Sequence, residues 1–259
     1  PPIFHGVKHL VLIERSIDEG YGPALSPRPW MNTTVVMNAK GGVGKTTVAT
    51  NVASYFAANG IPTAIMDYDP QGPSLHWLEQ PPADAPPVHG ADAASRTDRG
   101  LTSINRHLPR EIEQLVIDAP AGPTRLLMKE LVARANAIVI PVGPSTIDIH
   151  ATAKFIEELL LVGGIRNRNI RTAVVANRVR SSTAVYEPLE RFVRSLRMTF
   201  LTHLLDSEIY VESGDTGYGI FEMDARRAAE QQRQFMPIVN WVHRDTAARE
   251  DGSSNVVPL

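Results

Sequence analysis

The sequence feature that most constrains the fold is a glycine-rich segment at residues 40–47, which reads Lys-Gly-Gly-Val-Gly-Lys-Thr-Thr. Residues that favour β-strands precede it at 33–37, and apolar residues at helical spacing follow it from residue 48 to a glycine at position 60. Glycines allow backbone N–H groups to converge on phosphate oxygens, and a helix that begins here adds the positive end of its dipole. A strand, a glycine-rich turn and a helix in this order therefore predict a phosphate-binding loop.

Two side chains of this segment have the chemistry that a nucleoside triphosphate requires. Lys45 is expected to reach the β- and γ-phosphates, and the Thr46 hydroxyl is expected to bind Mg²⁺. The loop residues predicted to contact the nucleotide are Lys40, Gly41, Gly42, Val43, Gly44, Lys45, Thr46 and Thr47. A glycine-rich turn that carries lysines by chance is the alternative, but the flanking strand and helix patterns favour the phosphate loop.

Composition narrows the classes of function. The chain has 259 residues, which suits one large α/β domain with a single core. It has no cysteine, and this excludes disulfides, thiolate catalysis and iron–sulfur clusters bound by this chain. The formal net charge is −2, so contact with nucleic acid requires a local basic patch. No apolar run approaches the roughly 18 residues of a membrane-spanning helix.

Strand and helix patterns alternate from residue 31 onward. We expect strands at 33–38, 63–67, 115–118, 137–141, 172–177 and 199–203, and helices at 45–59, 124–135, 147–162, 185–196 and from 224 onward. The strand at 137–141 is apolar without interruption, which indicates a strand buried on both faces in a parallel sheet. The predicted fold class is α/β, a doubly wound and mostly parallel sheet flanked by helices, with ligands at the carboxyl ends of the strands.

The segments outside this alternation are expected to be irregular. The proline-rich segment 80–99 is predicted to be a surface loop. Prolines and glycines interrupt residues 1–30, which we interpret as an N-terminal arm, or as residues from a cloning vector or an upstream reading frame with Met31 as the natural start. The nucleotide-binding domain is expected to cover 31–251, followed by a disordered tail at 252–259.

Carboxylates end the second and third of the strands expected in the alternating region. Asp67 and Asp69 follow the strand at 63–67, and Asp118 ends the strand at 115–118. We expect Asp67 to hold Mg²⁺ through water and Asp69 to orient or activate the attacking water. Asp118 is expected to reach Mg²⁺ from the side of Thr46. Each aspartate could instead be only a turn or strand cap, but its position after a phosphate loop favours the catalytic interpretation.

The phosphate loop resembles the deviant Walker A motif of the ParA/MinD family of ATPases, which are P-loop NTPases. Position 39 is alanine where the standard motif has glycine, and Lys40 supplies an additional lysine. The segment 67–72 is similar to the family's switch I motif, Asp-x-Asp-Pro-Gln, and 115–122 is similar to its Walker B strand and switch II. The resemblance covers about residues 31–242 and fits the short ParA type without an N-terminal DNA-reading domain, as in orphan or plasmid ParA proteins and carboxysome-positioning McdA-like proteins.

This resemblance implies a slow ATPase that uses ATP and Mg²⁺ and forms a homodimer with ATP between its subunits. Lys40 would reach the phosphates of the other subunit, and Asp69 would serve hydrolysis. Asn177 and Arg178 match the adenine side of the family's site, where an amide offers both a donor and an acceptor. The second adenine-side loop would include Leu205 and Asp206.

The resemblance also implies a cytoplasmic, nucleoid-associated protein that positions a cargo such as a plasmid, a chromosome region or a carboxysome. A ParB-like or McdB-like adaptor on the cargo would stimulate hydrolysis, and the ATP-bound dimer would bind DNA without sequence preference through phosphate contacts. Six arginines are candidates for these contacts: Arg191, Arg194, Arg197, Arg226, Arg227 and Arg233. The first three are spaced by three residues and are expected on one helix face, although a solvated face is the alternative.

Other functions remain open at this point. A MinD-like membrane-associated switch would need a C-terminal amphipathic helix, and residues 235–242 supply apolar area. Pro237 is expected to interrupt that helix, and acidic residues at 245, 250 and 251 would be repelled by anionic lipid. We therefore interpret it as a packing helix and expect no membrane partner. A kinase or metabolic enzyme on the same loop and a non-enzymatic DNA-binding scaffold are the remaining alternatives.

Overall fold

The computed structural model describes residues 31–79, 82–94, 108–165, 170–180 and 186–250, with 244–250 described for the backbone only. The N-terminal segment 1–30 and the tail 252–259, for which the sequence makes predictions, lie outside these residues. The described part of the chain contains no helix long and apolar enough to span a membrane.

Seven strands form one parallel sheet in the order β3-β2-β4-β1-β5-β6-β7. The strands are β1 (Asn32–Val36), β2 (Thr63–Asp67), β3 (Val88–Asp92), β4 (Gln114–Asp118), β5 (Ala137–Val142), β6 (Arg171–Val179) and β7 (Thr199–Leu205). β1 lies at the centre, between β4 and β5. Because β1, β4 and β2 are adjacent and parallel, the loops that follow them meet at one edge of the sheet.

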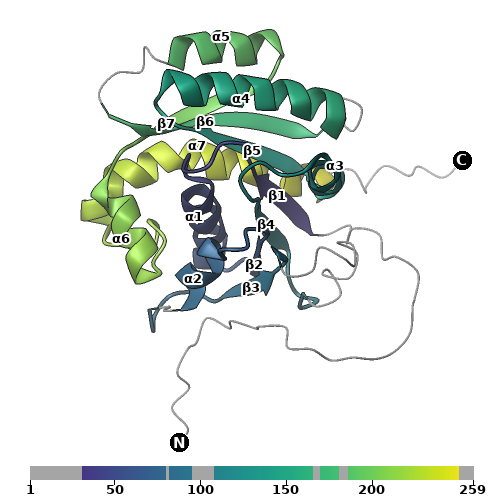
Figure 1. Ribbon diagram of the computed structural model, residues 1–259. Helices are drawn as coiled ribbons and strands as arrows, with labels where there is room; N and C mark the ends of the chain where they lie inside the picture. The colour runs from purple at the N-terminus through teal and green to yellow at the C-terminus, as the bar shows by residue number, and fades with distance from the viewer. Residues whose placement is uncertain (1–30, 80–81, 95–107, 166–169, 181–185, 251–259) are drawn as a thin grey trace, which may run out of the picture.

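Helices cover both faces of the sheet (Figure 1). They are α1 (Lys45–Ala58), α2 (Pro73–Glu79), α3 (Arg125–Arg134), α4 (Thr146–Glu158) with a π-helical turn η3 (Leu159–Gly163), α5 (Glu187–Ser195), α6 (Glu208–Thr216) and α7 (Ala225–Glu250). Two hydrophobic cores result, one beneath α3, α4 and α5 and the other beneath α1, α2, α6 and α7. The predicted fold class, a doubly wound α/β sheet flanked by helices, is confirmed.

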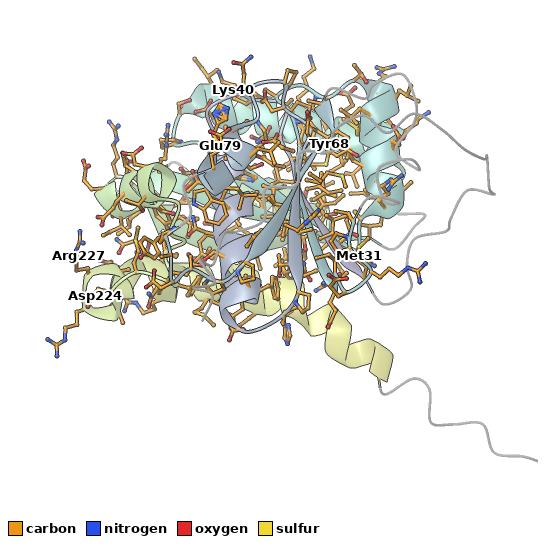
Figure 2. The ribbon with its side chains drawn as sticks, turned by 90° about the horizontal axis from the view of Figure 1, so that it is seen from below. Met31, Lys40, Tyr68, Glu79, Asp224 and Arg227 are labelled. Atoms are coloured by element: carbon orange, nitrogen blue, oxygen red, sulfur yellow. The ribbon has the colours of Figure 1, made fainter. Side chains whose placement is uncertain are left out.

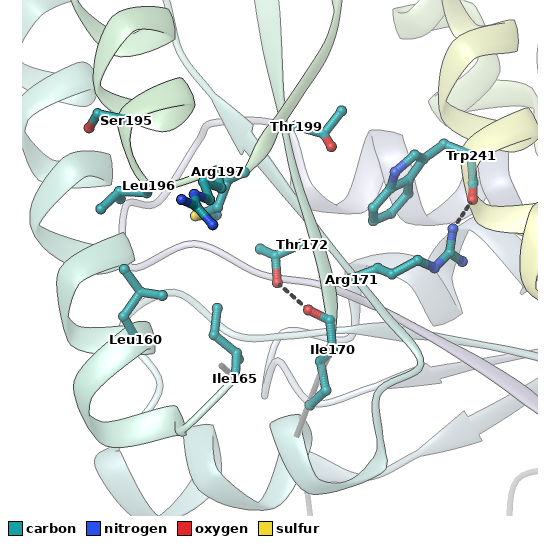
Figure 3. Close-up of a pocket in the computed structure, with 11 residues that line it drawn as sticks. Leu160, Ile165, Ile170, Arg171, Thr172, Ser195, Leu196, Arg197, Thr199 and Trp241 are labelled. Carbon is teal, nitrogen blue, oxygen red and sulfur yellow. Dashed lines mark hydrogen bonds between the residues drawn. The ribbon is translucent and has the colours of Figure 1, made fainter. Parts of the chain in front are cut away.

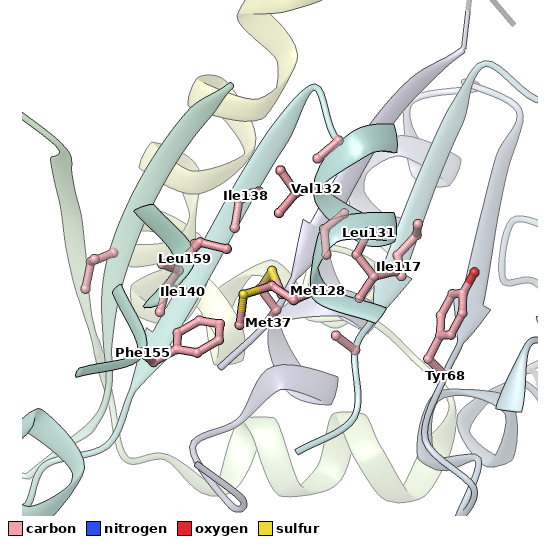
Figure 4. Close-up of a cluster of buried hydrophobic side chains, with 14 of the residues drawn as sticks. Met37, Tyr68, Ile117, Met128, Leu131, Val132, Ile138, Ile140, Phe155 and Leu159 are labelled. Atoms are coloured by element: carbon pink, nitrogen blue, oxygen red, sulfur yellow. The ribbon is translucent and has the colours of Figure 1, made fainter. Parts of the chain in front are cut away.

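The alternation of side chains along β5 shows how one strand serves both cores. Ile138 and Ile140 pack in the first core with Leu131 of α3 and Phe155 of α4 (Figure 4). Val139, between them, points to the opposite face and belongs to the second core. All six residues of β5 are buried, which is why the strand is apolar throughout.

The segment 80–99 is not simply a surface loop, so that prediction is wrong in part. Residues Val88–Asp92 form β3, which pairs in parallel with β2 at the edge of the sheet. Val88 and Ala91 are buried there. The strand is short and preceded by prolines, and its pairing with β2 is a long-range interaction that local pattern does not reveal. The short helices α2 and α6 were likewise not expected from the sequence.

Two further expectations about helices are corrected. α7 continues through Pro237, because Phe235, Ile238 and Val242 are fully buried beside it and tertiary packing outweighs the backbone bond that proline removes. α5 ends at Ser195, and Arg197 lies beyond it with a φ of 58°. Arg197 therefore does not share a helix face with Arg191 and Arg194.

Candidate nucleotide-binding site

The glycine-rich segment forms the turn between β1 and α1, as its pattern predicts. Gly42 and Gly44 have φ values of 76° and 89°, which side chains with a Cβ rarely adopt. Lys45 is the first residue of α1, so Thr46 and Thr47 lie in the first helical turn, where backbone N–H groups have no partner within the helix. This arrangement suits an anion with several oxygens.

Sheet register brings the carboxylates to this loop. Asp67 at the end of β2 is in register with Asp118 at the end of β4, and Asp118 is in register with Val36 at the end of β1. The phosphate loop and Asp118, which are far apart in the sequence, therefore lie close together in the fold. The phosphate loop and the segments that follow β2 and β4 meet at the carboxyl ends of the strands.

Asp118 and Thr46 form the best candidate for a magnesium site. The Thr46 hydroxyl donates to Asp118 Oδ2 over 2.8 Å, and Asp118 Oδ1 is buried with no hydrogen-bond partner among the described residues. Burial, together with the nearby Asp67 carboxylate, raises the pKa of Asp118 to about 7, and the Thr46 hydrogen bond and the Lys45 ammonium oppose this increase. Hydroxyl and carboxylate oxygens are the ligands that Mg²⁺ prefers, so the residues present fit this ion.

Asp67 differs from Asp118 in that both of its carboxylate oxygens accept hydrogen bonds from the loop that follows β2. Its Oδ1 accepts from the Asp69 backbone N–H at 2.8 Å, and its Oδ2 accepts from both the backbone N–H and the hydroxyl of Ser74, at 2.8 and 2.6 Å. Burial raises the pKa of Asp67 and these hydrogen bonds oppose the increase. Its carboxylate thus fixes the 67–74 loop; a contact to Mg²⁺ through water stays a prediction.

Lys45 and Asp69 face the same site. Lys45 is buried and its Nζ donates to the Lys40 carbonyl at 3.4 Å. Desolvation lowers the pKa of Lys45, whereas the Asp118 and Asp69 carboxylates raise it. Asp69 is half-buried and its Oδ1 accepts from the Gln71 backbone N–H. Lys40 is exposed at the surface (Figure 2).

The end of β6 is hydrogen-bonded to the phosphate loop. The Asn177 amide donates to the Val43 carbonyl at 2.9 Å, and Arg178 Nη1 donates to the Gly42 carbonyl at 3.4 Å. The hydroxyl of Tyr186, which is fully buried, donates to the Asn177 carbonyl at 3.1 Å. Asn177 and Arg178 therefore lie at the loop, and their contact with adenine stays a prediction. Sequence reasoning missed Tyr186, since a tyrosine near a helix start carries no signal of such a contact.

Gly44 is required by this close approach. A Cβ at position 44 would collide with the Asn177 side-chain amide, and the φ of 89° is unfavourable for any other residue. We expect Gly44→Ala to destabilise the protein by about 2 kcal/mol and to weaken nucleotide binding, because the loop or Asn177 must move. Urea unfolding and nucleotide titration measure the two effects. Gly60→Ala, at a φ of 75° but with no atom near its Cβ, is the control that separates backbone strain from the collision.

The second predicted adenine-side loop follows β7 and is held by α7. The Leu205 backbone N–H donates to the Gln234 side chain at 3.0 Å, and the Asp206 backbone N–H donates to the Val179 carbonyl at 2.9 Å. Arg180 Nε donates to Asp206 Oδ2 at 2.9 Å. Leu205 and Asp206 thus lie beside the end of β6. Gln234 was not identified from sequence, because its partner is distant along the chain.

Most of the candidate DNA-contacting arginines form ion pairs within the chain. Arg191 and Arg194 pair with acids one turn earlier on α5, and Arg233 pairs within α7. Arg227 pairs with Glu212 through two bonds of 3.1 and 2.7 Å and lies near Asp224 at the start of α7 (Figure 2). Arg226 makes no ion pair within the described residues. Exposed pairs of this kind contribute little free energy, so phosphate groups can compete for these arginines.

The parallel sheet, the phosphate loop after β1 and the carboxylates after β2 and β4 define a P-loop NTPase. The family model of the CobQ/CobB/MinD/ParA nucleotide-binding domain matches residues 34–217. The chain therefore belongs to this family, to which its deviant Walker A motif also points.

Relatives with assigned roles include proteins that distribute carboxysomes. The chain is 26% identical over 209 residues to the maintenance of carboxysome distribution protein A of Halothiobacillus neapolitanus, covering 79% of this chain and 94% of the relative. It is 25% identical over 225 residues to the protein of the same name from Gloeobacter kilaueensis, covering 86% and 98%. The chromosome-partitioning ATPase Soj of Thermus thermophilus is 30% identical over 52% of this chain and 64% of its own length.

Solved structures share the fold. Apo McdA of Cyanothece superposes with a TM-score of 0.61 at 16% identity, covering 80% of this chain and 98% of that one. MinD of Pyrococcus horikoshii in complex with Mg-ADP superposes with a TM-score of 0.63 at 17% identity, covering 82% and 96%. At these identities the likeness concerns the fold alone.

Proposed function

We propose that this protein is a ParA-type positioning ATPase that hydrolyses ATP to ADP and phosphate. The observation that supports it most is the convergence of Lys45, the hydrogen-bonded pair Thr46 and Asp118, and Asp69 at one edge of the sheet. Together these residues supply what phosphoryl transfer to water needs: a cation for the phosphates, oxygen ligands for a metal and a carboxylate for the water.

Each group has its own role in this proposal. Backbone N–H groups of residues 41–47 and the Lys45 ammonium hold the phosphates. Thr46 and Asp118 would hold Mg²⁺, which when bound neutralises charge on the phosphate oxygens. Asp69 orients the attacking water and accepts its proton, because it is half-buried yet has one oxygen for which no hydrogen bond is seen among the described residues.

The proposal includes a dimer with ATP between two copies. Lys40 is exposed beside the phosphate loop, and its side chain is available to a second copy. A lysine delivers a compact positive charge to a phosphate without needing a fixed planar geometry. ATP thereby becomes part of the interface, and hydrolysis releases the two copies.

The cargo and adaptor are proposed from the relatives. Carboxysome distribution is the role named for two relatives that match 79% and 86% of this chain, and chromosome partitioning is named for Soj. We infer a cytoplasmic, nucleoid-associated switch that positions a carboxysome, a plasmid or a chromosome region. An adaptor of the McdB or ParB kind would stimulate a slow intrinsic hydrolysis.

The test is binding to an arbitrary DNA duplex without nucleotide, with ADP and with ATP plus Mg²⁺, at two salt concentrations. We expect binding only with ATP, and a steep loss of affinity at the higher salt concentration because each phosphate contact releases counterions. Equal binding in all three states, or no binding in any, would contradict the nucleotide-gated switch.

The six candidate DNA-contacting arginines, which we call the arginine patch, are tested by reversing the charge of two of them. Arg194→Glu combined with Arg226→Glu is expected to weaken DNA binding by at least about tenfold and to leave nucleotide affinity unchanged. Gel-shift and nucleotide titrations measure the two affinities. Arg125→Glu, an exposed arginine of α3 that also forms a surface ion pair, is the matched control. Unchanged DNA affinity in the double variant would rule out this patch.

The MinD-like membrane switch is the alternative, and the packing of α7 weighs against it. The apolar residues that would enter a membrane include Phe235, Ile238, Val239 and Val242, and all four are fully buried against the sheet. Sedimentation with anionic liposomes in the presence of ATP distinguishes the two functions: a MinD-like protein would sediment with the vesicles.

A further inference from the structure

Asn38 is a fully buried polar side chain that has no role in the function proposed above. It follows β1 and stands two residues before Lys40, at the entry to the phosphate loop. Its exposed fraction is 0%, so Asn38 itself contacts neither solvent nor a second copy of the chain. A buried amide is unfavourable unless its donor and acceptor atoms have partners, and those partners indicate what Asn38 holds in place.

The Asn38 amide connects the phosphate loop to β5 and α4. Its Nδ2 donates to the Pro141 carbonyl of β5 at 2.8 Å and to the hydroxyl of Thr152 on α4 at 2.9 Å. Its Oδ1 accepts from the Lys40 backbone N–H at 3.2 Å. Exchanging the amide oxygen and nitrogen would place two oxygens against each other at Pro141, so this orientation is the one that satisfies all of these partners.

The backbone of Lys40 is held from both sides. Its N–H donates to Asn38, and its carbonyl accepts from Lys45 Nζ at 3.4 Å. In the proposed function the Lys45 ammonium binds the phosphates, and the Asn38 bond then keeps the Lys40 backbone attached to β5 and α4. The side chain of Lys40 remains exposed at the surface, where a second copy can reach it (Figure 2).

We propose that Asn38 is a positioning residue for Lys40, which fixes the loop backbone so that the Lys40 ammonium points to the phosphates bound by a second copy. An ordered backbone reduces the conformational entropy that the loop loses when two copies associate. Thr152 supports this arrangement from α4 by acting through Asn38. The role rests on the proposed ATP dimer, and it identifies a residue that sets the position of the bridging lysine.

Hydrogen exchange of the Lys40 backbone N–H tests this hold in the absence of nucleotide. In Asn38→Ala the N–H loses its acceptor. We therefore expect its exchange, measured by NMR on the nucleotide-free chain, to be at least about fivefold faster than in the parent protein.

The matched control is Asn32→Ala, which removes another buried asparagine, at the first residue of β1. The Asn32 amide donates to Gln114 Oε1 at 3.1 Å and to the Val242 carbonyl at 3.5 Å. It lies at the amino ends of the strands, the edge where Arg171 donates to the Trp241 carbonyl (Figure 3). Because this is the edge opposite the phosphate loop, exchange at the loop should stay at the parent rate in the control.

Dimerisation distinguishes positioning from a general loss of stability, and sedimentation velocity with Mg²⁺ and a slowly hydrolysed ATP analogue measures it. We expect Asn38→Ala to weaken dimerisation at least about fivefold. Its ADP affinity should stay within about threefold of the parent value, because the loop glycines and Lys45 are unchanged. In a Lys40→Ala background the same change should weaken dimerisation no further, since a residue that acts through Lys40 has no effect once that lysine is absent.

Thr152→Val and Thr152→Ser keep the test valid if Asn38→Ala fails to fold. Valine removes the hydroxyl that accepts from Asn38 and keeps the shape of the side chain, whereas serine retains the hydroxyl. Thr152→Val should accelerate exchange at Lys40 and weaken dimerisation, and Thr152→Ser should resemble the parent protein.

Unchanged exchange at Lys40 in both Asn38→Ala and Thr152→Val would overturn the proposal. An equal further weakening of the dimer by Asn38→Ala in the Lys40→Ala background would also overturn it, because Asn38 would then act independently of Lys40. Both results refer to a parent protein that dimerises with ATP. A parent protein that stays monomeric with ATP would instead overturn the proposed dimer itself, so the two failures are distinguishable.

Discussion

Lys45→Ala is expected to remove productive ATP binding, with an affinity at least about 100-fold lower than that of the parent protein. Lys45 is buried at the start of α1, where its ammonium group is held by the Lys40 carbonyl and attracted by Asp118 and Asp69. Triphosphate oxygens would place far more negative charge beside it than the protein does. Loss of the ammonium leaves the phosphates with backbone donors alone. Titration with a fluorescent ATP analogue or calorimetry measures the affinity.

The matched control is Lys154→Ala, an exposed lysine on α4. It should bind ATP like the parent protein. Lys45→Arg is a second useful variant, because it keeps the charge but replaces a compact ammonium with a larger planar group in a buried space. ATP affinity in Lys45→Ala within threefold of the parent value would show that the loop does not hold phosphates as we describe.

Asp69→Ala is expected to bind ATP but to hydrolyse it at least about 100-fold more slowly than the parent protein. Asp69 lies on the loop after β2, and Asp67 fixes that loop through the Asp69 backbone N–H and through Ser74. Asp67 holds the backbone of Asp69, whereas the Asp69 carboxylate accepts one loop bond, from the exposed Gln71 backbone N–H, so truncation should remove the water-orienting group and leave most of the loop in place. Phosphate release, measured with saturating ATP and Mg²⁺, reports the rate.

A measurement of ATP affinity distinguishes a loss of hydrolysis from a loss of ATP binding. ATP affinity in Asp69→Ala should remain within about threefold of the parent value, since binding rests on the phosphate loop. The variant should also remain on DNA in the presence of ATP if hydrolysis is what releases it. Asp215→Ala, an exposed aspartate at the end of α6, controls for the loss of a carboxylate. Hydrolysis at the parent rate in Asp69→Ala would assign water activation to another group.

Local sequence pattern was sufficient to predict an element of the site where the residues of that element are neighbours in the chain. The glycines of the phosphate loop, Lys45 and Thr46 are fixed by one turn and the start of one helix, and the structure places them as the motif predicts. Strand ends marked by aspartates were also identifiable, because an apolar run that ends in Asp is a local signal. The sequence did not reveal that both Asp67 oxygens accept hydrogen bonds from Asp69 and Ser74, whereas one Asp118 oxygen has no hydrogen-bond partner in the described part of the chain.

Contacts between distant segments decided the parts of the fold and of the site that local pattern did not predict. The packing of α7 overrode the interruption expected at Pro237, and pairing with β2 made a strand of residues that look like a loop. The hydrogen bond from Asn177 to Val43 joins residues 134 apart in the sequence, and the Tyr186 hydroxyl holds the Asn177 carbonyl from the start of α5. By itself the sequence determined the α/β fold class, the glycine-rich turn between β1 and α1 and the aspartates at the strand ends, because each has a short local pattern. Only the tertiary structure decided which carboxylate oxygens of the described site accept hydrogen bonds, because this results from packing among segments far apart in the chain.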